Sequence, residues 1–286
     1  MDLIYRYDPY SPLDSPANLD ADAAIETLRR GHERYARFVA LIQREVLGGA
    51  TAGPLVIPSD PLALGLPAAS GEAPAQVPFA LALGCSDARL PIERIFDQPP
   101  NSLFVIRVAG NVLGVECLGS IDYAVGRLGG SMKLLFVLGH SGCGAVTAAV
   151  DSYLAPRDYG EIALTHAVRS LLDRIQLAVR GAAHALERVC GAEVARAPGY
   201  RAALIEAAVY LNAALTAFDV RREVPSGPES PRVVYAVFDL VDQRVRPWPN
   251  SPAGDPPFGD VPSSPDEFDA LGTRLAQAIV AKGLLD

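Results

Sequence analysis

The amino-acid sequence predicts an α/β fold with a mostly parallel central sheet of four or five strands, flanked by helices and preceded by an extended N-terminal helix. Short, continuous apolar segments alternate with longer segments of helical periodicity, which is typical of a parallel sheet covered on both faces. Of the 286 residues, 50% are hydrophobic and 20% are charged, close to the averages for globular proteins. This composition excludes a disordered chain and a coiled coil.

The N-terminal part of the chain is predicted to hold one long helix between two irregular segments. Residues 1–20 are expected to form an irregular arm, and a helix is expected from Ala21 to Leu47 with Asp20 as its N-cap. The apolar stripe of this helix has no obvious cover in its own segment, so it either packs in the core or contacts a partner. Residues 48–77 are rich in Ala, Pro and Gly and are expected to form a flexible insertion.

The rest of the chain is predicted to alternate between strands and helices, within a single domain that spans residues 1–286. This length exceeds the usual size of a domain, although α/β folds often reach it. A second flexible insertion is expected at about 247–265, which is dense in proline. Strands are expected at Phe79–Gly84, Leu103–Ala109, Lys133–Leu138 and Val233–Leu240, and helices at Val115–Leu128, from about Gly144, at 161–190, at 201–218 and from Pro265 to about Leu284.

Charge and cysteine content narrow the class of protein. The net charge of −8 argues against nucleic acid or an anionic membrane as the main partner. No signal peptide is recognised at the N-terminus, and the apolar run Leu204–Phe218 is broken by Glu206 and Asn212, so no membrane span is expected. Four cysteines do not form a disulfide framework in a chain of this length. We therefore expect a cytoplasmic protein whose thiols are free or metal-bound.

Two motifs with metal-binding residues follow the first and third predicted strands. Residues 85–89 read CSDAR, and residues 139–144 read GHSGCG. Because the carboxyl ends of parallel strands meet at one edge of a sheet, Cys85 is expected to lie beside His140 and Cys143. Two thiolates and one imidazole are zinc ligands, and three protein ligands leave the fourth tetrahedral position open, as in a catalytic site. Cys143 is expected at a helix start, where the helix dipole favours the thiolate.

An acidic and a basic residue accompany the first motif. Two thiolates and a neutral imidazole give a zinc site of zero net charge, which is a weaker Lewis acid than zinc held by three histidines. Asp87 is placed to accept a hydrogen bond from a zinc-bound hydroxide and to orient it. Arg89, two residues further on, is expected to pair with this carboxylate and keep it ionised.

These residues resemble the β-class carbonic anhydrases. CSDAR matches the C-x-D-x-R motif of that family and HSGC matches its H-x-x-C motif, while FVIRVAGN, GSIDYAV and VLGHSGCGAV follow the family in order and spacing. The resemblance implies one zinc ion per subunit on Cys85, His140 and Cys143, and a catalytic dyad of Asp87 and Arg89. It also implies reversible hydration of CO₂ to bicarbonate and a proton, by attack of a zinc-bound hydroxide.

The same resemblance implies a CO₂ pocket and a subunit arrangement. By motif position the pocket residues are Gln76, Phe104, Tyr123 and Gly144. The active site is expected at a subunit interface, in a homodimer or a dimer-based higher oligomer. Some members carry a Trp in an inhibitory bicarbonate site where this chain has Ala82, so that inhibition is not expected.

Several alternatives stay open at this point. On the same scaffold the chain could hydrolyse CS₂ or COS. It could also be a catalytically silent, zinc-stabilised binding protein, and only the two insertions favour this alternative. The intact pair of Asp87 and Arg89 argues against the silent protein. A further hypothesis, drawn from some family members, is that Asp87 takes the fourth zinc position at low pH and closes the site. Cys117 and Cys190 are interpreted as inert, buried thiols.

Overall fold

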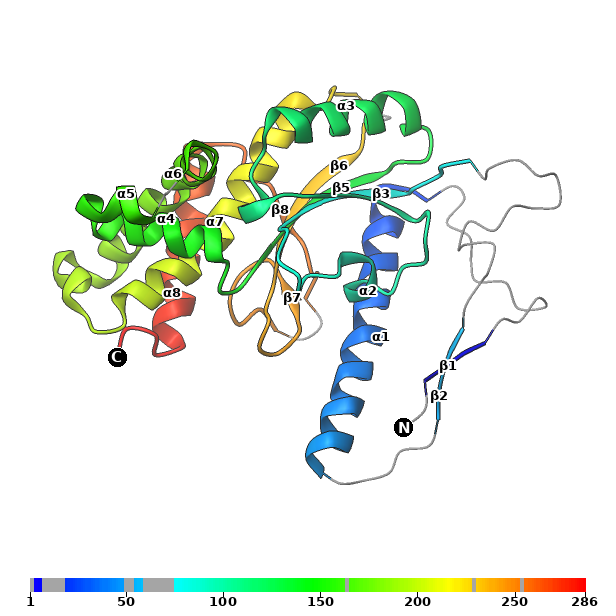
Figure 1. Ribbon diagram of the computed structural model, residues 1–286, viewed down its shortest axis with the longest axis horizontal. Helices are drawn as coiled ribbons and strands as arrows, with labels where there is room; N and C mark the ends of the chain where they lie inside the picture. The colour runs from blue at the N-terminus through cyan, green and yellow to red at the C-terminus, as the bar shows by residue number, and fades with distance from the viewer. Residues whose placement is uncertain are drawn as a thin grey trace.

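A central sheet with helices on both faces organises the computed structural model, which describes residues 3–6, 19–48, 54–58, 75–162, 165–227, 230–252 and 255–286 (Figure 1). The strand order is β4-β3-β5-β6-β7, with β8 also paired to β6. The first four strands are parallel to one another, and the two short ones are antiparallel to β6. The predicted fold class is therefore confirmed. The strands are β3 (Ala80–Gly84), β4 (Leu103–Arg107), β5 (Leu134–His140), β6 (Arg232–Phe238), β7 (Val245–Arg246) and β8 (Gly259–Asp260).

The long helices lie where they were predicted, although α6 begins later and α7 ends later than expected; the short helices α2 and α5 were not predicted. Asp20 caps α1 as expected, because its Oδ1 accepts a hydrogen bond from Ala23 N at 2.8 Å. Thr165 and Ser264 cap α6 and α8 in the same way. The helices are α1 (Ala21–Gly48), α2 (Ile92–Ile95), α3 (Val115–Leu128), α4 (Gly144–Leu154), α5 (Tyr159–Ile162), α6 (His166–Cys190), α7 (Tyr200–Glu223) and α8 (Pro265–Ala281).

The two faces of the sheet bury different kinds of side chain. On one face α7 packs against β5 and β6, and its backbone approaches Gly139, where a Cβ would lie 3.6 Å from Val209 O. On the other face Phe136 meets Phe96, with ring centroids 5.2 Å apart, and both rings pack on Phe258. Since alternate residues of a strand face opposite sides, Phe136 and Gly139 belong to different layers. β5 is thus buried on both faces, which explains why its sequence is apolar up to its last residue, His140.

Helix α7 is the one described helix that is long and apolar enough to cross a membrane. In its most apolar window, 72% of the residues are buried inside the protein, as in the core helix of a globular domain. Glu206, one of the two polar residues that interrupt the apolar run, pairs with Lys282 at 3.1 Å after α8. The other, Asn212, is buried and lies next to the candidate site.

The segments predicted to be irregular contain regular structure that the sequence did not signal. Residues 3–6 form β1 (Leu3–Arg6), which pairs in parallel with β2 (Leu55–Pro58) in a separate two-stranded sheet. The remainder of the predicted insertion at 48–77 lies largely outside the described residues. The segment 247–265 is not a free loop where it is described, because it includes β8 and buries Phe258 against the aromatic cluster.

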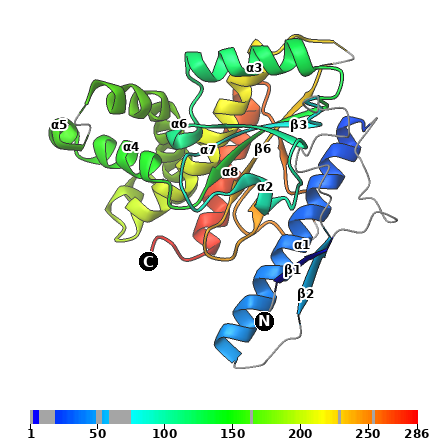
Figure 2. The same ribbon diagram turned by 45° about the vertical axis from the view of Figure 1, so that its right-hand side comes forward.

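Helix α1 is only partly buried by the part of the chain that the structure describes. Ala24 and Leu28, near its start, are fully buried in the core, whereas Leu47 at its end is 85% exposed. Figure 2 shows the second half of the helix extending away from the sheet. The first half of α1 therefore belongs to the core, and the second half is less buried.

His32 on α1 forms hydrogen bonds with α2 and β7. It is 5% exposed; its Nδ1 lies 3.1 Å from Ile95 O, and its Nε2 lies 3.0 Å from Val245 N. Val245 N–H can only donate, so Nε2 is the acceptor and the ring proton is on Nδ1. Burial, together with the positive charges of Arg244 and Arg246, lowers the pKa of His32 to about 4.

Acidification is expected to destabilise the protein through His32. Between the usual pKa of about 6.5 and the lowered one, the unfolded chain binds a proton that the folded protein does not bind. The stabilisation from His32 is present above pH 6.5 and falls as the pH drops, by about 2 kcal/mol between pH 7 and pH 5. Urea unfolding at both pH values measures this effect. Between pH 7 and pH 5 the free energy of unfolding should fall less for His32→Gln than for the parent protein. Equal losses would contradict the assignment.

Candidate metal centre and active site

Two cysteines and one histidine meet at the carboxyl edge of the sheet. Cys85 directly follows β3, His140 is the last residue of β5, and Cys143 is the N-cap residue of α4. Their ligand atoms all lie within 4.8 Å of one another, and the two sulfur atoms are 3.9 Å apart. The three predicted zinc ligands are therefore brought together, and all three are buried.

His140 is oriented for a ligand on Nε2. Its Nδ1 donates a hydrogen bond to Ser141 O at 3.1 Å, which leaves the lone pair on Nε2. Nε2 is fully buried and has no hydrogen-bond partner among the described residues. The chain then turns at Gly142, whose φ of +63° is a conformation that side chains rarely adopt, and this turn brings Cys143 back towards His140. A buried imidazole nitrogen without a partner, beside two thiols, fits a zinc ion.

The two thiols influence each other's ionisation. The hydrogen bond between the sulfur atoms lowers the pKa of Cys85, and the nearby His140 lowers it further. The same contact, with burial, raises the pKa of Cys143. The backbone N–H groups of Ala145 and Val146 in the first turn of α4 oppose that rise, which agrees with the predicted position of Cys143 at a helix start. Cys85 is therefore the thiol that ionises first.

Asp87 and Arg89 form the predicted ion pair next to these ligands. Arg89 Nε and Nη2 donate to the two carboxylate oxygens of Asp87 at 2.9 and 2.7 Å. This contact holds the pKa of Asp87 well below its usual range. Asp87 Oδ2 lies 3.8 Å from His140 Nε2, so the carboxylate faces the place where the ligand atoms converge.

Arg107, at the end of β4, holds the loop that carries this pair. Its Nε donates to Cys85 O at 3.0 Å, and its Nη2 donates to Asp87 O. Arg107 lies in the FVIRVAGN segment, but no role was predicted for it. A signal for it is its position at the end of the neighbouring strand, where its guanidinium can reach backbone carbonyls of the adjacent loop.

The residues predicted to line a CO₂ pocket are only partly brought together. The rings of Phe104 on β4 and Tyr123 on α3 have centroids 6.4 Å apart, and Tyr123 is 53% exposed. Gly144 begins α4 beside the ligand Cys143. Gln76 lies exposed before β3 and forms no hydrogen bond with another described residue. Within one chain, then, Tyr123 and Gln76 are exposed, and only Phe104 and Tyr123 are seen to pack together.

The two remaining cysteines differ from each other. Cys117 is 7% exposed within α3, which agrees with its interpretation as a buried thiol. The burial expected for Cys190 is wrong, because this residue is exposed at the end of α6. A helix terminus leaves its last side chains uncovered, and the sequence alone does not show which side of the last turn faces the core.

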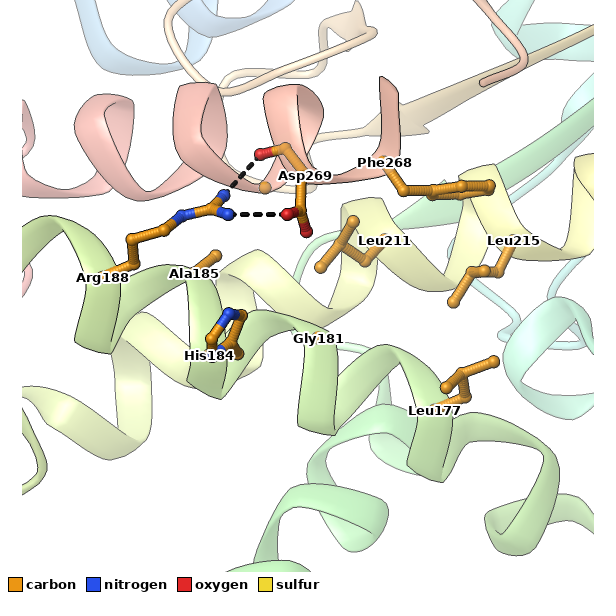
Figure 3. Close-up of a pocket in the computed structure, with 10 residues that line it drawn as sticks. Leu177, Gly181, His184, Ala185, Arg188, Leu211, Leu215, Phe268 and Asp269 are labelled. Carbon is orange, nitrogen blue, oxygen red and sulfur yellow. Dashed lines mark hydrogen bonds and ion pairs between the residues drawn. The ribbon is translucent and has the colours of Figure 1, made fainter. Parts of the chain in front are cut away.

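A separate pocket of about 160 Å³ lies between α6, α7 and α8. Figure 3 shows its apolar wall, formed by Leu211, Leu215 and Phe268, and the paired Arg188 and Asp269 at one end. The guanidinium of Arg188 donates to Asp269 Oδ2 at 2.8 Å, so the charges at this end neutralise each other. None of its lining residues belongs to the cluster of metal ligands.

Comparison with known proteins agrees with the geometry of the site. A family model described as carbonic anhydrase matches residues 80–223, just over half of the chain, and this segment contains the three ligands and the ion pair. The chain belongs to the β-class carbonic anhydrase family. The carbonic anhydrase match begins at β3 and ends with α7, so α1, β6 and α8 lie outside it.

Curated carbonic anhydrases resemble one part of the chain. Carbonic anhydrase 2 of Mycobacterium tuberculosis is 48% identical over 81 residues, which are 28% of this chain and 38% of the relative. The carbonic anhydrase of Mycolicibacterium smegmatis is 42% identical over 101 residues, 35% of this chain and 46% of the relative. The matched segments thus span less than half the length of these relatives.

Solved β-carbonic anhydrases are more distant in sequence. A Coccomyxa β-carbonic anhydrase in complex with acetazolamide is 21% identical, with a TM-score of 0.44, and the alignment covers 60% of this chain and 72% of that one. For a β-carbonic anhydrase of Aspergillus fumigatus the identity is 20%, the TM-score is 0.44, and the coverage is 70% and 84%.

Proposed function

We propose that this chain catalyses the reversible hydration of CO₂ to bicarbonate and a proton at a zinc centre held by Cys85, His140 and Cys143. The observation that carries the proposal is the buried cluster of two thiols and one imidazole nitrogen that has no partner among the described residues. An ionised carboxylate lies 3.8 Å from that nitrogen. Membership of the carbonic anhydrase family supports the same reaction.

The donor set suits zinc and leaves room for chemistry. Thiolate sulfur and imidazole nitrogen are preferred zinc ligands, and a site with three protein ligands keeps one position for water or substrate. When bound, the ion would supply a Lewis acid that activates water for attack on CO₂. The chain would hold one such ion per subunit.

The protein's own groups orient the attacking water. Arg89 keeps Asp87 ionised at all but very acidic pH, so this carboxylate is an acceptor and never a donor in the working range. An acceptor-only group beside the cluster fixes where the proton of the water points, and thereby directs an oxygen lone pair at the substrate. Arg107 supports this geometry by holding the carbonyls of Cys85 and Asp87.

The substrate site is proposed to be completed by a second copy of the chain. Phe104, Tyr123 and Gly144 are proposed to line the CO₂ pocket, with Gln76 orienting one oxygen. Tyr123 is 53% exposed and Val115, also on α3, is 74% exposed, so this helix carries exposed apolar side chains. A homodimer, or an oligomer built from dimers, would cover these side chains. The single domain and the cytoplasmic location stay predictions.

Metal analysis and a CO₂ hydration assay on one preparation test the proposal. We expect about one zinc ion per chain, as a three-ligand catalytic site implies, and hydration well above the uncatalysed rate at mildly alkaline pH. Zinc-loaded protein without CO₂ hydration would contradict the reaction. If zinc-loaded protein without CO₂ hydration releases sulfide from CS₂, the chain is a hydrolase of CS₂ or COS. If the zinc-loaded protein has neither activity, the chain is a zinc-stabilised binding protein.

A further inference from the structure

We propose that Asn212 is a positioning residue for the zinc ligand Cys85 and acts on it through the backbone of Gly110. The inference deepens the proposed function, since it concerns the same metal site. Three residues from different parts of the chain form the connection: Asn212 on α7, Gly110 after β4, and Cys85 after β3. Each link is a hydrogen bond seen in the structure.

The first link joins Gly110 to the sulfur atom. Gly110 N–H donates a hydrogen bond to Cys85 Sγ, with an N–S distance of 3.4 Å. A hydrogen bond to a thiolate draws electron density from the sulfur and fixes the direction of its remaining lone pairs. Such contacts around a metal ligand commonly change metal affinity or activity by about 10- to 100-fold.

The backbone at Gly110 is held in an unusual conformation. Its φ of +68° lies in the left-handed region, and an added Cβ would approach Ile175 Cδ1 to 2.9 Å and Ala145 Cβ to 3.1 Å. Glycine is therefore required at this position. A glycine is also free to adopt other conformations, so something else must keep its N–H directed at Cys85.

Asn212 supplies that restraint. Its Nδ2 donates to Gly110 O at 2.8 Å, and the side chain is only 3% exposed. The residues on both sides of it, Leu211 and Ala213, are buried and apolar. A buried amide costs free energy unless it is hydrogen-bonded, so an apolar residue would suit the interior of α7 better if packing were its only task. The asparagine that interrupts the apolar run of α7 is thus explained by its contact with the metal site.

Removal of the amide should weaken metal binding without removing a ligand. Asn212→Leu loses the donor but fits the apolar surroundings, and Asn212→Ser is too short to reach Gly110 O. We expect both variants to bind zinc about 10-fold more weakly in competition with a chelator. In the cobalt-substituted protein, the thiolate-to-metal charge-transfer band should shift, because the electron density on Cys85 changes.

A matched control separates this role from a general effect on the core. Thr216→Val alters a buried polar residue one turn further along α7, and it should leave the zinc affinity and the cobalt spectrum unchanged. Thermal unfolding of each variant identifies any that do not fold, and Asn212→Ser replaces Asn212→Leu if only the latter fails. Parent-like zinc affinity and an unchanged cobalt spectrum in a folded Asn212 variant would overturn the inference alone. A parent protein that binds no zinc would overturn the proposed function as well.

Discussion

Replacement of Cys143 by alanine is expected to abolish zinc binding and CO₂ hydration together. The sulfur of Cys143 is one of three ligand atoms within 4.8 Å of one another, and no other described cysteine, histidine or carboxylate completes this set. Structural zinc sites bind with about 10–16 kcal/mol shared among four ligands, so the loss of one thiolate should raise the zinc dissociation constant by about 100- to 1,000-fold. Zinc content after dialysis and the hydration rate measure the two effects.

The control for this variant is another buried thiol. Cys117→Ala also removes a sulfur atom from the interior, but Cys117 lies in α3 and is not part of the cluster. It should retain both zinc and activity. One zinc ion per chain in Cys143→Ala would show that the ligand set is wrong, whatever the activity of that variant.

The substitution Asp87→Asn is expected to separate metal binding from turnover. Asparagine keeps the shape of the side chain, but its amide nitrogen donates where the carboxylate accepts, and it no longer neutralises Arg89. The three ligands are untouched, so zinc should stay bound. Because the attacking water loses its orientation, kcat should fall by about 100-fold.

The chain offers a control with the same chemistry at a distance from the site. Asp151 forms a similar two-point ion pair with Arg201, at 2.7 and 2.8 Å, on the surface of α4. Asp151→Asn breaks a comparable pair and should leave turnover unchanged. If Asp87→Asn turned over CO₂ as fast as the parent, the role assigned to the carboxylate would be incorrect.

The centre of the fold was predictable because its signals are local. A strand that is buried on both faces needs a largely apolar sequence, as in β5 up to its last residue, His140. Helix α3 was predicted with the bounds that the structure has. The ligands followed from the same reasoning, since Cys85 and His140 stand at the ends of parallel strands that are neighbours in the sheet. Their residue types then indicated zinc.

What escaped prediction depends on contacts between distant segments. β1 and β2 are four residues each, too short for a clear pattern, and each is stabilised by the other. Asn212 and Gly110 are 102 positions apart, and only the folded chain shows that they touch. The partial burial of α1 likewise depends on which elements lie against it.

The position of the ligands also bears on when the protein can bind its metal. Cys85, His140 and Cys143 are carried by β3, β5 and the start of α4, and these elements are held by apolar packing and backbone hydrogen bonds that involve no metal. We therefore expect the chain to complete its fold before it binds the ion, which a circular-dichroism spectrum of the metal-free protein would check. In this respect it differs from small zinc domains, whose folding waits for the metal. Metal supply would then limit how much of the protein is active, and not how much of it is folded.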